Sequence, residues 1–244
     1  MPLTSLIFED LGRTSYQDAW DYQTFKHKSL IENKLKYKKD GFLTYEQPHV
    51  LIFTEHFPVY TLGKSGSLDH LLLSEEEMKA RSIDFFHINR GGDITFHGPG
   101  QIVGYPILDL ECFFTDVHRY VRFLEEAVIR TLTMYGVEAY RTEGYTGVWV
   151  RGNPISGATD AAAQKQRKIC AIGVHLSRWV TLHGWAFNVN TDLSYFQHIV
   201  PCGISEEDKT VTSLQYELGR EVDIEQVKER LKNHFATLFE CQFV

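Results

Sequence analysis

RGGDITFHGPGQIVGYPILDL, residues 90–110, is the stretch on which the inferred fold depends, because no other part of the chain is so dense in special residues. Gly91 and Gly92 lack a Cβ, so their backbone can approach a ligand closely or take positive φ angles. The segment ITFH that follows alternates apolar and polar side chains, which indicates a strand with Thr95 and His97 on one face. The stretch therefore predicts a glycine loop that leads into a short strand.

The tripeptide Gly98-Pro99-Gly100 then breaks the strand, and two interpretations stay open. Glycine and proline punctuate turns in many folds, so the simplest interpretation is the turn of a hairpin. The alternative is a ligand site, because an arginine, two glycines and a histidine around one strand end supply more donors than a turn needs.

The whole chain has the composition of a folded globular protein. Its 244 residues are 43% hydrophobic and 23% charged, close to ordinary values, which argues against wholesale disorder. No shift in composition marks a domain boundary, and we predict a single domain over residues 1–244.

Charge and motif content exclude several classes of function. The net charge is -7 with acidic residues spread along the chain, which argues against nucleic acid as a partner. No apolar run approaches the roughly 20 residues that span a bilayer, and Glu9 and Asp10 interrupt the N-terminal apolar stretch, so we expect no membrane association and a cytoplasmic location. The four cysteines form no C-x-x-C pair and the eleven histidines no H-E-x-x-H motif, so no metal site is indicated and no cofactor is implied.

Hydrophobic periodicity predicts helices inserted among paired strands. Capping residues and helical spacing indicate helices at residues 15–38, 116–132 and 223–239, with Thr115 or Asp116 capping the second, and a brief helix after Ser74. Strands are expected at residues 3–8, 50–53, 85–88, 101–110, 137–140, 146–150, 168–176 and 179–190. Because strands often follow one another directly, we predict an α+β fold with a mixed, mainly antiparallel sheet flanked by helices.

Three local features are harder to place. Residues 151–167 carry no core pattern and contain several turn-forming residues, so we predict an exposed and mobile loop. Ser177-Arg178 is expected to form a two-residue hairpin turn, although it is not the most favourable pair. Pro106, within the expected central strand, should lie at a bulge or on an unpaired side.

Cys202 is the candidate nucleophile. A cysteine is often a small core hydrophobe, and Cys112 and Cys170 fit that description. Cys202 differs because it lies between Pro201 and Gly203, on a turn that could expose its sulfur to a substrate. A useful nucleophile must also be a thiolate, which requires a cation or a general base nearby.

Lys168 is the candidate partner of that thiol. It begins an otherwise apolar strand, where an ordinary lysine would simply reach into water. A partly desolvated lysine binds its proton less tightly, so Lys168 could take the thiol proton before the thiolate attacks a thioester. Three histidines are rivals for the role of base, although each is also interpretable as a structural residue: His97, His175 and His183.

The ordered motifs resemble the signature of the lipoyl(octanoyl) transferases, which transfer octanoyl groups from acyl carrier protein to proteins in lipoate biosynthesis. The resemblance covers residues 90–107 and extends to Gly147-Val-Trp-Val, Lys168-Ile-Cys-Ala-Ile-Gly-Val, His183-Gly-Trp-Ala-Phe-Asn-Val-Asn and Pro201-Cys-Gly-Ile. It spans about residues 3–218, nearly the whole chain. It implies a single catalytic domain with the fold of the biotin and lipoate protein ligases, built around one acyl pocket.

The resemblance also assigns roles by position. Cys202 would carry the acyl thioester, and Lys168 would lower the pKa of its thiol. The residues that would line the substrate pocket are Arg90, Gly91, Gly92, Asp93, Ile94, Thr95, Phe96, His97, Ala171, Ile172, Gly173, Gly184, Trp185 and Ala186.

The implied partners are an octanoyl-acyl carrier protein as donor and lipoyl domains as acceptors, such as those of 2-oxo acid dehydrogenases and the glycine cleavage H protein. Because acyl carrier proteins are acidic, docking on this acidic chain would need a local basic patch. Residues that cluster in sequence and could form it are Arg151, Lys165, Arg167, Lys168 and Arg178.

Two departures and two rival functions remain. Phe96 stands where the family often has tyrosine, and the 151–167 connection is longer than usual. The related ATP-dependent lipoate and biotin ligases use a similar glycine loop and strand lysine but need no nucleophilic cysteine. A non-catalytic module that binds lipoyl domains is the other alternative, although the presence of Cys202 and Lys168 argues against it.

Overall fold

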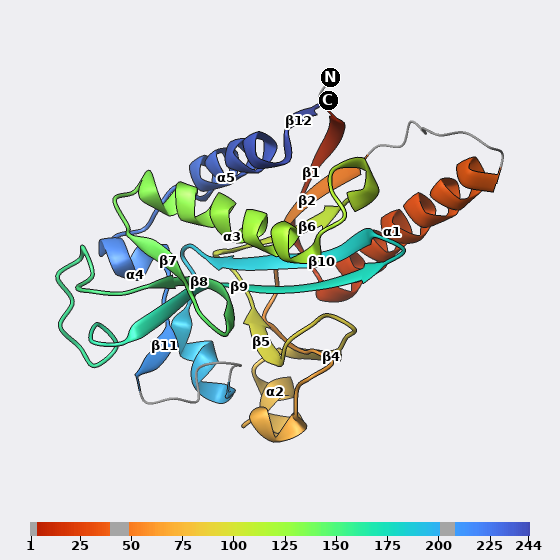
Figure 1. Cartoon of the computed structure of the whole chain (residues 1–244). Helices are drawn as coiled ribbons and strands as arrows, with labels where there is room; N and C mark the ends of the chain where they lie inside the picture. Colours follow the sequence, from red (N-terminus) through yellow and green to blue (C-terminus); the bar gives the residue numbers. More distant parts are fainter. Residues whose placement is uncertain (1–3, 40–48, 201–207) are drawn as a thin grey trace.

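The computed structural model describes residues 4–39, 49–200 and 208–244. Its larger sheet has the strand order β12-β1-β2-β6-β10-β9-β8-β7, with β11 paired to β9 (Figure 1). Among the described strands most neighbours in it are antiparallel, and the parallel pairs are β12 with β1, β1 with β2, and β11 with β9. The strands are β1 (Thr4–Thr14), β2 (His49–His56), β6 (Gln101–Ile107), β7 (Ala139–Thr142), β8 (Tyr145–Val150), β9 (Gln166–Ser177), β10 (Val180–Asn188), β11 (Lys209–Val211) and β12 (Cys241–Phe243).

Helices cover both faces of this sheet. The apolar stripes of α3 (Val117–Thr133) and α5 (Ile224–Phe239) pack on one face and form the main core with side chains such as Leu124 and Phe235. The helix α1 (Tyr16–Lys39) covers the other face through Ala19 and Leu30. Figure 1 shows α3 and α5 side by side, with α1 across the sheet from them. This arrangement confirms the predicted α+β class and the mixed, mainly antiparallel sheet.

The helix boundaries follow their capping residues. Asp116 accepts a hydrogen bond from the backbone N–H of Arg119, and Asp223 caps α5 in the same way through Gln226. The short helix α2 (Glu75–Ala80) begins with the complete capping box that its sequence predicts, between Ser74 and Glu77. The short helices that complete the fold are η1 (Leu68–His70), η2 (Leu110–Cys112), η3 (Leu193–His198) and α4 (Leu214–Leu218). No helix in the described ranges is both long enough and apolar enough to cross a membrane.

A second, three-stranded sheet carries the glycine loop. Its strand order is β4 (Asp84–His87), β3 (Val59–Leu62) and β5 (Ile94–His97). The turn at Gly98-Pro99-Gly100 joins β5 to β6, which belongs to the larger sheet. The hairpin interpretation of this turn is therefore wrong: the turn transfers the chain from one sheet to the other.

The β9–β10 hairpin turns one residue later than predicted. Arg178 and Trp179 have φ angles of 53° and 68°, and Ser177 pairs with Val180 across them. Two successive positive φ angles are what a two-residue hairpin turn requires when it follows the twist of its strands. The sequence predicted the hairpin but not the position of its turn, because neither Arg178 nor Trp179 is a glycine or an asparagine.

The central proline lies on an unpaired side, one of its two predicted positions. Strand β6 pairs with β2 as far as Ile107, but the paired residues of β10 end opposite Gly104. Pro106 therefore lies beyond the β10 ladder, and its missing N–H interrupts no hydrogen bond there.

The connection between β8 and β9 is shorter and better anchored than predicted. Strand β9 begins at Gln166, so two residues of the expected loop belong to the sheet. Ala163 and Arg167 are buried, with exposed fractions of 2% and 0%. The expectation of an exposed loop is thus wrong at its C-terminal end.

Candidate functional site

A cavity of about 350 Å³ lies between the glycine loop and the β9–β10 hairpin. Lys168 lines it, and so does every residue that the family resemblance assigned to the pocket except Phe96. Those assigned residues are Arg90, Gly91, Gly92, Asp93, Ile94, Thr95, His97, Ala171, Ile172, Gly173, Gly184, Trp185 and Ala186. Segments that lie far apart in the sequence therefore share one site.

Phe96 lies outside the cavity lining. Its ring stacks on Tyr195 with centroids 4.5 Å apart and an interplanar angle of 8°. A Cβ built on Gly98 would lie 2.4 Å from the same ring, so the turn closes tightly over it. Phe96 therefore packs the small sheet, and the hydroxyl of a tyrosine is not needed there to complete the cavity wall.

Arg90 holds the glycine loop in place. Its Nη2 donates to the carbonyl oxygen of Thr61 at 2.7 Å and to the Thr61 hydroxyl at 3.0 Å. The loop also presses against β9, where a Cβ on Gly173 would lie only 2.7 Å from the carbonyl oxygen of Gly91. Glycine is required at position 173 because any side chain would push the two backbones apart.

His97 is a neutral member of a buried polar chain. Gln101 donates through Nε2 to the Phe96 carbonyl and to Asn188 Oδ1, which leaves Gln101 Oε1 to accept from His97 Nδ1 at 2.9 Å. His97 Nε2 then accepts from the Thr61 hydroxyl at 3.3 Å. Burial, reinforced by His56 and Arg90, lowers the pKa of His97 well below its usual range. With both nitrogens engaged, this imidazole is a structural residue and a poor general base.

His183 is also neutral and is held in an unusual conformation. Its φ angle is 62°, although it lies within β10, and its Nε2 lies 2.9 Å from Asn89 Oδ1. Burial, together with Arg90, lowers the pKa of this imidazole to about 3. A histidine with so low a pKa stays uncharged at neutral pH and is a weak base. His175 does not line the cavity, so Lys168 is the remaining candidate base among the described residues that do.

A bulge in β9 directs Lys168 into the cavity. Val148 pairs with Cys170 and Trp149 with Lys168, so Ile169 has no partner in β8. In a regular strand Lys168 and Cys170 would share a face, but the extra residue moves Lys168 to the cavity side. Cys170 stays in the main core, and burial raises its thiol pKa far above the ordinary value.

Cys202 lies outside the described residues. The chain on either side of that segment lies at the cavity, because Phe196 and Val211 both line it. Val211 is moreover the parallel partner of Lys168 in the β11–β9 pairing.

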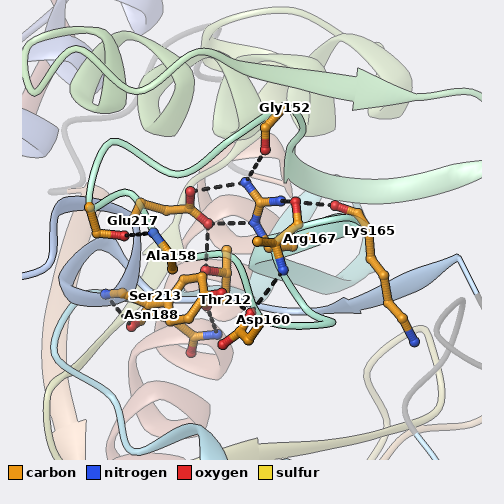
Figure 2. A network of polar contacts seen from close by, with 12 residues as sticks. Gly152, Ala158, Asp160, Lys165, Arg167, Asn188, Thr212, Ser213 and Glu217 are labelled. Carbon is orange, nitrogen blue, oxygen red and sulfur yellow. Dashed lines mark hydrogen bonds and ion pairs between the residues drawn. The ribbon is translucent and has the colours of Figure 1, made fainter.

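The residue next to Lys168 in β9, Arg167, forms a buried ion pair with Glu217. Figure 2 shows the guanidinium of Arg167 between the carboxylate of Glu217 and the backbone oxygens of Gly152 and Lys165. The two contacts to Glu217 measure 2.7 and 3.0 Å. The prediction that Arg167 belongs to a docking patch is therefore wrong, since its side chain is fully buried and its charge is neutralised by Glu217.

Glu217 connects this pair to the polar chain of His97. The hydroxyl of Thr212 donates to Glu217 Oε1 at 2.6 Å, and Asn188 Nδ2 donates to the carbonyl oxygen of Thr212 at 2.9 Å. Asn188 in turn accepts from Gln101. Hydrogen bonds thus run without interruption from the 152–165 connection to the cavity wall.

The family model for the lipoyl protein ligase A/B catalytic domain matches residues 17–236. The chain belongs to this family. An octanoyltransferase of Christiangramia forsetii is 51% identical over 234 residues, covering 96% of this chain and 95% of its own. An octanoyltransferase of Flavobacterium psychrophilum is 51% identical over 242 residues, covering 98% and 99%.

Solved structures of lipoate protein ligases share the fold. A bipartite lipoate protein ligase from Thermoplasma acidophilum superposes with a TM-score of 0.64 at 17% identity, covering 99% of this chain and 86% of its own. A lipoate-protein ligase A bound with ATP gives a TM-score of 0.63, covering 100% and 88%. At this identity the likeness confirms the predicted lipoate-ligase fold and says nothing of the reaction.

Sequence reasoning missed part of the cavity wall. The motifs already contained Gln101 and Asn188, and their polar side chains in apolar strands were the available signal. Other contributors come from segments without a motif, namely Tyr16, Val121, Tyr145 and Phe196.

Proposed function

We propose that this protein is an octanoyltransferase of protein lipoylation, with Cys202 as the acyl-carrying nucleophile and Lys168 as its proton acceptor. The observation that carries the proposal is the cavity in which Lys168 meets the glycine loop, in a chain 51% identical to octanoyltransferases over nearly its full length. The reaction belongs in the cytoplasm and needs neither metal nor cofactor.

The first half-reaction transfers octanoyl from the carrier to the enzyme. Lys168 takes the proton of the Cys202 thiol, and the thiolate attacks the carbonyl carbon of the octanoyl thioester. Backbone N–H groups stabilise the oxyanion. The carbon–sulfur bond to the phosphopantetheine arm of the carrier then breaks, and that sulfur leaves with the proton from Lys168.

The second half-reaction releases the enzyme. The ε-amine of a lysine on a lipoyl domain attacks the Cys202 thioester, an amide forms, and the Cys202 sulfur leaves. Lys168 takes the surplus proton of the attacking amine and gives it to the departing Cys202 sulfur, which returns both residues to their starting protonation states. No ATP is consumed, because the thioester of the donor supplies the driving force.

The cavity suits an aliphatic chain beside a polar entrance. Its volume of about 350 Å³ lies within the range of small-molecule sites. Each buried methylene contributes roughly 0.8 kcal/mol, or about fourfold in affinity, so affinity alone selects chain length weakly. Selection of octanoyl would therefore require a closed end to the space that holds the acyl chain.

Docking of an acidic carrier would use the exposed basic residues near the 152–165 connection. Arg151 is exposed and Lys165 is partly exposed at this connection, whereas Arg167 is buried and unavailable. The expected contribution of Arg178 is wrong, because this residue lies in the β9–β10 turn, at the other end of β9. Charge reversal at Lys165 should raise the KM for the carrier and leave kcat unchanged. The control is the reversal of an acidic residue outside the patch, Glu240, which is exposed at the end of α5. An unchanged KM in the Lys165 variant would reject the docking patch.

The test of the reaction is incubation with octanoyl carrier protein in the absence of ATP. We expect a mass gain of one octanoyl group on the enzyme, located on the Cys202 peptide and absent from Cys202→Ala. Transfer that requires free acid and ATP would instead establish a ligase. A chain that binds a lipoyl domain without multiple turnovers would establish the binding module.

A further inference from the structure

Lys168 lies on the face of a tryptophan. Its Nζ lies 4.6 Å from the centroid of the Trp149 ring, well inside the 6 Å within which a cation is attracted to an aromatic face. The two residues are direct partners across β8 and β9. Trp149 does not line the cavity, so its contact with the chemistry runs through the lysine.

The aromatic face that Trp149 offers to the Lys168 ammonium explains why position 149 is a tryptophan. Trp149 is fully buried, and in the described part of the chain no acceptor reaches its Nε1. An unpaired buried N–H is unfavourable, and a phenylalanine would avoid it. What tryptophan adds is the strongest aromatic surface for a cation. The edge of Tyr145, at 5.9 Å and 65°, packs against this ring.

The backbone around Gly147 brings the lysine onto that ring. Gly147 has a φ angle of 116°, and its N–H donates to the buried carboxylate of Glu125 at 3.0 Å. A Cβ on Gly147 would lie 2.5 Å from the carbonyl oxygen of Cys170 and 3.7 Å from Lys168 Cε. The lysine stem therefore passes close to the glycine on its way to Trp149, and glycine leaves room for the close approach of β8 to β9.

We infer that Trp149 is a positioning residue for Lys168, whose ammonium it holds on its indole face at the cavity wall. The catalytic meaning of this contact rests on the proposed function. An aromatic face attracts the ammonium and not the neutral amine. The ring therefore stabilises the state that exists after Lys168 has taken a proton from a thiol, and fixes the direction from which that proton is returned.

Other charged or titratable groups surround Lys168 and stay constant in the test. From α3, Glu125 contributes a carboxylate that is already paired with Arg122 and Arg141. From β11, Lys209 lies over the Tyr145 ring at 5.0 Å and carries the same charge as Lys168. From β9 itself, Cys170 lies on the opposite face, and burial raises its thiol pKa. The substitutions at Trp149 change the aromatic ring and leave these groups in place.

The test is an NMR titration of lysine labelled with carbon-13 at Cε in the full chain, with the Lys168 signal assigned by its loss in Lys168→Arg. Trp149→Leu removes the face, and Trp149→Phe keeps a weaker one. We expect the titration midpoint of Lys168 to fall by about one pH unit in the leucine variant and by less in the phenylalanine variant. Phe235→Leu, in the main core under α5, is the matched loss of a buried aromatic side chain and should leave the midpoint in place.

Thermal unfolding of the same variants separates positioning from stability. Trp149→Leu and Phe235→Leu should both lower Tm, but only the former should move the midpoint. An unmoved midpoint in both Trp149 variants would overturn the inference. Octanoyl transfer is measured separately: a wild-type protein that fails to transfer yet shows the shift in Trp149→Leu would refute the proposed function and support the role of Trp149.

Discussion

Replacing Arg167 by methionine should destabilise the protein more than most single substitutions. Arg167 and Glu217 have exposed side-chain fractions of 0% and 2%, and they contact each other through two hydrogen bonds. The substitution keeps most of the side-chain volume but leaves the Glu217 carboxylate buried without its counter-charge. It also removes the donors to three backbone oxygens, those of Gly152, Ala163 and Lys165.

The magnitude follows from the one-sided loss. Removing one partner of a buried ion pair costs about 3–5 kcal/mol. The three carbonyl groups that lose a donor place Arg167→Met toward the upper end of that range. For a chain of this length, 1 kcal/mol corresponds to roughly 2–4 °C in Tm, so Tm should fall on the order of 10 °C.

A double variant separates the pair from the volume. Arg167→Met with Glu217→Leu removes both charges, so no buried charge is stranded, and it should be more stable than Arg167→Met alone. It should remain below the wild type because the carbonyls of the connection still lack their donors. The assays are thermal and urea unfolding followed by circular dichroism.

Limited proteolysis gives a second measurement, and substitution of an exposed arginine gives the control. Arg167→Met should also be cut faster between residues 152 and 165, because that connection loses its anchor. Arg151→Met is the control, since Arg151 is exposed and lies over the Tyr140 ring at 4.9 Å. A loss of stability in Arg167→Met no larger than in Arg151→Met would refute the reasoning. So would a double variant whose loss of stability equals the sum of the losses in Arg167→Met and Glu217→Leu.

Two further predictions concern backbone strain and acid stability. Gly147→Ala should destabilise the protein by about 1–3 kcal/mol more than Gly144→Ala. Both positions have positive φ angles, but only at Gly147 would the added Cβ lie 2.5 Å from a carbonyl oxygen. Equal urea midpoints for the two variants would contradict this. Burial lowers the pKa of His49 to about 4, although Asp109 opposes the shift. The unfolded chain therefore takes up a proton below pH 6.5 that the folded chain refuses until about pH 4, and stability falls across that window by about 3 kcal/mol from this residue. His49→Asn, which can still accept from the Asp109 N–H, should flatten the fall, and an unchanged pH slope in urea titrations would disprove the assignment.

Helices were predictable because their signals are local. The box between Ser74 and Glu77 and the caps at Asp116 and Asp223 involve neighbours within three residues. The apolar stripe of α5 likewise repeats within its own sequence. At α5 the cap is one-sided, since Asp223 accepts from the Gln226 N–H while Gln226 Oε1 accepts from Tyr135.

The errors fall where the structure depends on distant partners. Arg167 looked like a surface residue because its counter-charge lies 50 positions away in α4. The hairpin interpretation of the Gly-Pro-Gly turn stayed open because the sequence does not show that β5 and β6 belong to different sheets. The short strands β11 and β12 escaped notice, since three residues carry no measurable period.

For the site, alternation was a better guide than resemblance at one position. The ITFH pattern placed Thr95 and His97 on one face and therefore Phe96 on the other, and the structure agrees, with Phe96 stacked on Tyr195. The resemblance had included Phe96 in the pocket because it follows the motif as a continuous stretch. A strand directs alternate side chains to one surface, and the exception here is Ile94, which shares the face of Phe96 but reaches the cavity at the start of β5, next to the glycine loop.

Lys168 shows the opposite case, in which alternation alone would mislead. Counted by twos from Cys170, the lysine belongs in the main core, where an unpaired ammonium would be strongly disfavoured. The extra residue Ile169 reverses the face, so that Lys168 reaches the cavity while Cys170 stays buried with a raised thiol pKa. One inserted residue thus separates the two groups and leaves the core thiol unreactive. The irregular backbone at Ile169 and Gly147 is therefore what gives this lysine access to the cavity, and a regular β8–β9 ladder would abolish that access.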